Sequence, residues 1–302
     1  MKVAAKILVV FAAVVLVGAL LAPPVYWLGR ALVDAGTLPV LARVKFGSYF
    51  NRTLMILGLA SIWPLLCWLG LASFKDLMLE PNPRRFFDLG LGALVGTAGF
   101  AFVLLFLYLG GFVALRGRLP WDSAWTLVLT AVAVPLIEET FFRGVLFGVL
   151  RRSWRWPYAL AFLSFFFAIL HFVNPRPGAP RISGAHWTSG FEHLAGLFWQ
   201  FREPRLVLGG WVTLFLVGWI LGYTVVRTRS LYLAMGLHGG WVLAMRFFDE
   251  FCRPVVTHTA WIGKDVRMGV AAVLLMLATH GVLYLLLEGR GPATPGNAEG
   301  GA

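Results

Sequence analysis

The residues best suited to chemistry are two glutamates and an arginine inside an apolar stretch. Glu138, Glu139 and Arg143 interrupt the run TLVLTAVAVPLIEETFFRGVLFGVL. A charge at the centre of a membrane helix costs about 2.5–3.5 kcal/mol on insertion scales, so these groups must pair or face a wet cavity. Glu139 and Arg143 are four residues apart and can pair on one helix face. Glu138 is rotated by ~100° from Glu139, so it has no evident partner in its own helix.

Two histidines occupy comparable places in later apolar stretches. His171 ends the run YALAFLSFFFAILHFV, and His238 lies within LYLAMGLHGGWVLAMRFF. A carboxylate removed from water becomes a stronger base, a histidine can orient a water, and a second histidine can stabilise an oxyanion. These groups suit hydrolysis by an activated water. They also suit a proton relay in a transporter, and Glu139 with Arg143 could be a purely structural ion pair.

The composition places these residues in a membrane protein. The chain has 302 residues, 59% of them hydrophobic and 13% charged, with a mean hydropathy of +0.78. A soluble domain is about 25% charged and could not bury this much apolar surface. The net charge of +12 comes mainly from basic residues between apolar runs. That placement favours membrane lipids with anionic headgroups as partners, and no nucleic acid.

The apolar runs predict an all-α fold, a polytopic bundle of about eight transmembrane helices with the active site inside it. A span needs about 20 apolar residues. We expect spans near residues 5–28, 54–74, 87–112, 124–150, 157–173, 206–226, 231–249 and 267–287. Residues 1–290 should form a single integral membrane domain, and the Gly/Pro/Ala-rich tail 291–302 should be disordered. No internal repeat is evident, which weakens the transporter interpretation.

One connecting segment and the cysteines complete the pattern. Within residues 174–205, the stretch FEHLAGLFWQF (191–201) is too short to span, so we expect it along the interface or over a cavity. Cys67 and Cys252 match no metal-binding spacing, and the sequence has no HExxH motif. We therefore expect no metal and no other cofactor.

The three polar motifs together resemble the CAAX-protease and bacteriocin-processing (Abi, Rce1-like) family of glutamate-type intramembrane proteases. The family pattern is EExxxR, then FxxxH, then HxxxN or HxxxD, on three transmembrane helices. The matching stretches are Glu138-Glu139-Thr-Phe-Phe-Arg143, Phe167-Ala-Ile-Leu-His171 and His238-Gly-Gly-Trp-Val242. The resemblance covers about residues 124–249.

The resemblance implies an intramembrane endopeptidase in which Glu138 and His171 activate the attacking water. By the same analogy, Glu139 and Arg143 hold the geometry of the site, and His238 contributes to the oxyanion hole. The substrate would be a membrane-anchored or secreted peptide or protein, which the segment 174–205 would help to select. The expected location is a cell membrane, namely the bacterial inner membrane. No prenyl-binding groove is identified by the sequence.

Val242 departs from the family pattern, because it stands where the family has Asn or Asp and cannot donate a hydrogen bond. Losing one oxyanion donor typically costs about 10²–10³ in rate. Arg246, eight residues beyond His238, and Asn174, just past His171, are candidate replacement donors. The alternative interpretation is a weakened or inactive family member that acts as a membrane scaffold or immunity factor.

Overall fold

The structure is a computed structural model that describes residues 3–70, 82–116, 124–173, 184–202, 204–256 and 269–288. Within these ranges the fold is all-α, as the sequence predicts, apart from one pair of short strands. The helices are α1 (Val3–Asp34), α2 (Phe46–Leu69), α3 (Arg85–Leu109), α4 (Ala124–Glu139), α5 (Gly148–Leu150), α6 (Trp156–Leu170), α7 (Ser189–Gly196), α8 (Pro204–Thr228), α9 (Tyr232–Phe251) and α10 (Val270–Glu288). Shorter turns of helix are η1 (Pro39–Arg43), η3 (Thr140–Phe147) and η4 (Leu197–Arg202). Strands β1 (Val113–Leu115) and β2 (Cys252–Pro254) pair antiparallel.

Each predicted span forms a helix, but the described part of the chain has six helices long and apolar enough to cross a membrane. Helix α6 is apolar but has 15 residues, and α9, with 20 residues, is not among the six. Near its end α9 carries Arg246, Asp249 and Glu250, which lower its hydropathy. The chain is thus a multi-pass integral membrane protein in which two of the expected spans are short or polar.

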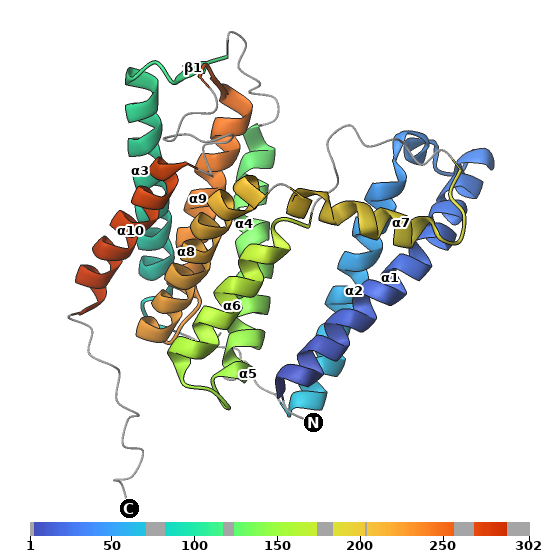
Figure 1. Cartoon of the computed structure of the whole chain (residues 1–302), viewed down its shortest axis with the longest axis horizontal. Helices are drawn as coiled ribbons and strands as arrows, with labels where there is room; N and C mark the ends of the chain where they lie inside the picture. Colours follow the sequence, from blue (N-terminus) through green and yellow to red (C-terminus); the bar gives the residue numbers. More distant parts are fainter. Residues whose placement is uncertain are drawn as a thin grey trace, which may run out of the picture. The chain divides into compact units, whose positions relative to one another are not determined.

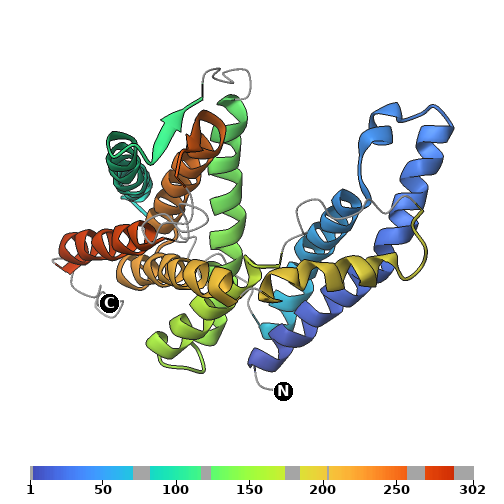
Figure 2. The ribbon, with the colours of Figure 1, turned by 45° about the horizontal axis from the view of Figure 1, so that its top comes forward.

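The first of two compact units comprises residues 1–72 and 169–207. Its helices α1 and α2 pack together, and α7 crosses α1 (Figures 1 and 2). Gly190 of α7 lies against the backbone of Ala19, where a larger residue would collide. His193 of α7 packs edge-on against the ring of Phe50, with centroids 4.8 Å apart, and burial lowers its pKa from the ordinary value. The stretch 191–201 is therefore helical and packs against α1 and α2.

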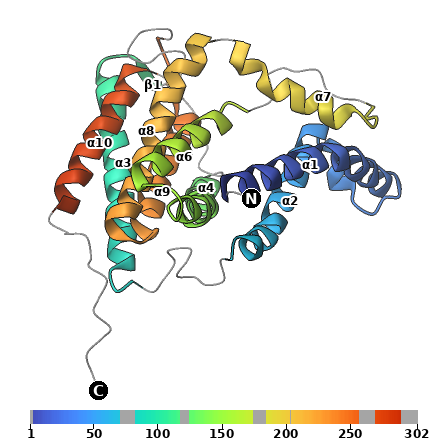
Figure 3. The same ribbon diagram turned by 60° about the horizontal axis from the view of Figure 1, so that its bottom comes forward.

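The second unit comprises residues 73–168 and 208–302, and α9 is its most buried long helix. Helices α3 and α4 both pack on α9, as Figure 3 shows. The α3–α9 contact is made by small residues on both sides. A Cβ added at Gly96 would lie 2.5 Å from the carbonyl oxygen of Leu237, and one at Gly240 would lie 2.6 Å from that of Ala93. Glycines spaced by four residues let two membrane helices approach this closely.

Candidate active site

The two glutamates and the arginine lie where the fourth span changes its winding. Glu138 and Glu139 end α4, and Arg143 lies in η3, which is a π-helix. Such segments are uncommon and occur frequently at functional sites. The predicted pair is present: Arg143 Nη1 donates to Glu139 Oε1 over 2.9 Å, and the two side chains are 1% and 0% exposed.

Arg143 is held by two further helices. Its Nη2 donates to the carbonyl oxygen of Gly218 on α8 over 3.3 Å. Its guanidinium lies over the ring of Phe167 on α6, 4.6 Å from the ring centroid. A Cβ at Gly218 would lie 2.9 Å from the Cα of Ser164, so α6 and α8 approach closely at this point. The sequence alone did not predict either contact. For Phe167, the available signal was its position as the phenylalanine of the FxxxH motif.

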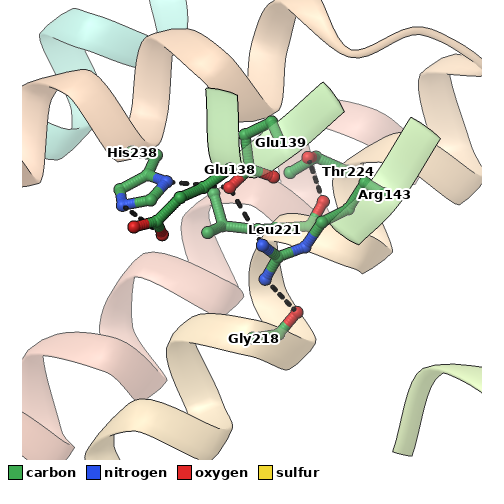
Figure 4. Close-up of polar contacts among 7 residues, drawn as sticks. All are labelled: Glu138, Glu139, Arg143, Gly218, Leu221, Thr224 and His238. Carbon is green, nitrogen blue, oxygen red and sulfur yellow. Dashed lines mark hydrogen bonds and ion pairs between the residues drawn. The ribbon is translucent and has the colours of Figure 1, made fainter. Parts of the chain in front are cut away.

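His238 joins the same cluster from α9, as Figure 4 shows. Its Nδ1 lies 2.8 Å from Glu139 Oε1, the oxygen that Arg143 also contacts. Its Nε2 lies 4.0 Å from Glu138 Oε2, and its side chain is 8% exposed. The cationic guanidinium of Arg143 favours the carboxylate form of Glu139, which can only accept hydrogen bonds. Nδ1 of His238 therefore carries a proton, and Nε2 is directed to Glu138.

A proline and a glycine place α9 against α4 at this point. Pro135 has no N–H to offer the carbonyl oxygen of Ala131, one helical turn before it. A Cβ at Gly239 would lie 2.8 Å from that same oxygen. The absence of a side chain at Gly239 thus lets α9 approach α4 at the residue next to His238.

Glu138 differs from Glu139 in its access to water. The side chain of Glu138 is 30% exposed, whereas that of Glu139 is fully buried. Glu138 Oε2 has no hydrogen-bond partner within the described ranges. A carboxylate that is partly exposed and lies beside an oriented imidazole can accept a proton from a water molecule. Within the described part of the chain, no group of three or more His, Cys, Asp or Glu side chains could hold a metal ion.

The other candidate residues are placed as follows. His171 is exposed in the turn that follows α6 and belongs to the first unit, so its pairing with Glu138 stays a prediction. Arg246 Nη2 pairs with Glu250 over 3.3 Å. Val242 is buried on α9. Asn174 and the tail 291–302 lie outside the described residues.

Residues 120–244 match the family model described as Type II CAAX prenyl endopeptidase Rce1-like. This part of the chain is similar to the Rce1-like family. The matched segment contains all three motifs, from Glu138 to His238, and it confirms the resemblance to CAAX-type intramembrane proteases. Arg246 lies just beyond it. No curated protein and no solved structure matches the chain.

Proposed function

We propose that this protein hydrolyses a peptide bond of a membrane-associated protein or peptide, with Glu138 as the general base. The observation that supports this most is the unequal use of the two glutamates. Glu139 is buried and its Oε1 is contacted by Arg143 and His238, while Glu138 is partly exposed and its Oε2 has no hydrogen-bond partner among the described residues. Of the two glutamates, Glu138 is therefore the one free to take a proton from water.

The attacking water would lie against Glu138, with His171 as the second activating group that the family analogy assigns. Glu139 and Arg143 keep the cluster in place, since their pairing offsets both charges inside the bundle. His238 lies beside Glu138 and lines the same site. A protease working at this place would act on lipid-embedded or lipid-anchored chains, in the bacterial inner membrane by our expectation.

The proposal is tested by comparing cleavage products in membranes of cells that express the wild type, Glu138→Ala or His171→Ala at equal protein level. Terminal peptides are identified by mass spectrometry. We expect at least one cleavage product to disappear in both variants. Glu288→Ala is the matched control, because Glu288 is a carboxylate paired with Tyr284 outside the cluster. Identical products in all four strains would overturn the proposal.

A second candidate function is a scaffold or immunity factor with a degraded site. Val242 favours it, because the usual oxyanion donor is missing. The intact contacts among Glu139, Arg143 and His238 favour the protease. Unchanged processing in the experiment above would support the scaffold instead.

A further inference from the structure

We propose that His238 is the general acid of the reaction. Its Nε2 donates a proton to the leaving amine, and Glu138 then returns a proton to Nε2. This inference rests on the proposed protease function. It assigns His238 a different role from that of an oxyanion donor, which the family resemblance implies.

The first support is the orientation of the imidazole. Glu139 Oε1 holds Nδ1 at 2.8 Å, and Arg143 holds the same oxygen at 2.9 Å. A carboxylate on Nδ1 fixes the ring and stabilises the imidazolium that forms on protonation, as the aspartate does in a Ser-His-Asp triad. The nitrogen that remains for proton transfer is Nε2, and it lies 4.0 Å from Glu138 Oε2. At that distance, His238 Nε2 and Glu138 Oε2 can both contact one small reacting group.

The second support is the charge of the cluster. Arg143 is a cation, and Glu138 and Glu139 are carboxylates, so the three groups carry one uncompensated negative charge. One added proton, shared between Glu138 and His238, makes the cluster neutral. Neutrality matters here because a net charge at this depth is costly. Where α3 contacts α9 beside His238, it presents the uncharged residues Gly92, Gly96 and Thr97.

The third support is Val242. If His238 were one half of a two-donor oxyanion hole, its missing partner would leave the site incomplete. An acid at His238 needs no neighbouring donor, because the leaving nitrogen receives its proton from Nε2 alone. Val242 then alters only the oxyanion hole, and both residues that transfer protons, Glu138 and His238, are present.

The proton balance closes over one turnover. The resting pair is ionised Glu138 and protonated His238. Water gives a proton to Glu138, and its oxygen forms a bond to the carbonyl carbon, whose π electrons move to oxygen. When the carbon–nitrogen bond breaks, its electron pair stays on nitrogen, which takes the proton from Nε2. Glu138 then passes its proton to Nε2, and an acid and an amine leave.

The test uses one peptide that contains the cleavage site found above, synthesised with the scissile amide or with an ester in its place. An alkoxide leaves with far less need of a proton than an amine does. With purified protein in detergent, we expect His238→Gln to lower kcat/KM by at least ~10²-fold for the amide, the scale of general acid–base catalysis. For the ester we expect a loss below ~10-fold. An equal loss on both substrates would overturn the inference.

The wild type gives a second measurement that needs no variant to fold. Hydrolysis of the amide should require a protonated group and decline at high pH, and hydrolysis of the ester should show no such decline. The same alkaline decline on both substrates would contradict the inference. Glu138→Gln separates the two proposals, because it should abolish cleavage of both substrates. If Glu138→Gln cleaves both at the wild-type rate, the assignment of Glu138 as the general base fails.

Discussion

A single oxygen of Glu139 organises the candidate site at the scale of the residue. It accepts from Arg143 and from His238, and these three groups come from α4, η3 and α9. The charge of Glu139 is fully buried, so it depends on the guanidinium for compensation. The sequence predicts the Glu139–Arg143 pair from spacing alone, because it is local. The contact with His238 is 99 residues away along the chain and depends on packing, so spacing cannot predict it.

Removing the arginine should therefore leave a buried carboxylate without compensation. Breaking a buried ion pair from one side costs about 3–5 kcal/mol. We expect Arg143→Met to lower the free energy of unfolding in detergent by about that amount. Adding Glu139→Gln to Arg143→Met should recover most of the loss, because no unpaired charge remains. A loss below about 1 kcal/mol for Arg143→Met alone would contradict the role given to the pair.

At the scale of the elements, the position of α9 depends on close helix contacts at glycines rather than on the apolar character of its sequence. Gly96 faces α9 from α3, and Gly239 of α9 faces α4 on the other contact. His238 reaches Glu139 because these contacts let α9 lie between the two helices. In the sequence, Gly239 and Gly240 indicate a close approach by another helix or by a substrate backbone, but they do not say which element meets each of them. The π-helical winding of η3 was likewise not predictable, since the residue types of TFFRGVLF do not distinguish a π-helix from an α-helix.

Filling one of these glycines should disturb the site from a distance. A Cβ at Gly96 would lie 2.5 Å from the carbonyl oxygen of Leu237, the residue before His238. We expect Gly96→Ala to lower the free energy of unfolding by about 1–3 kcal/mol, which is typical of overpacking, and to reduce peptide cleavage. Gly90→Ala on the same helix is the matched control, because no atom lies within 4 Å of its added Cβ. Thermal unfolding and cleavage should be unchanged or slightly improved there, and equal losses in both variants would count against the glycine contact.

At the scale of the whole molecule, the apolar runs predict the helices better than they predict which of them cross the membrane. Each of the eight expected segments contains a helix within the described residues, because a long apolar run favours the helix whether it is lipid-facing or enclosed. The charged residues that lower the hydropathy of α9 lie near its end, where Arg246 and Glu250 are partly exposed and pair with each other. The 20 residues of α9 give about 30 Å at the standard rise, which matches the hydrocarbon thickness.

Cysteine labelling tests whether α9 crosses the membrane. In a chain carrying Cys67→Ser and Cys252→Ala, a cysteine at Arg229 and one at Arg253 flank α9, and both positions are exposed. We expect a membrane-impermeant maleimide to label them from opposite sides. A cysteine at Arg116 is the matched control for Arg253, because Arg116 Nε donates to the carbonyl oxygen of Cys252. Labelling of positions 229 and 253 from one side would show that α9 does not cross.

The central claim is that Glu138 activates water for peptide hydrolysis, and the rate of the Glu138→Gln variant tests it most directly. This substitution keeps the size of the side chain and removes its ability to take a proton. With purified protein and the peptide identified in cells, we predict that kcat/KM falls by at least ~10²-fold. Thermal unfolding should stay close to that of the wild type, and Glu288→Gln should cleave normally. Cleavage by Glu138→Gln at the wild-type rate would contradict the account.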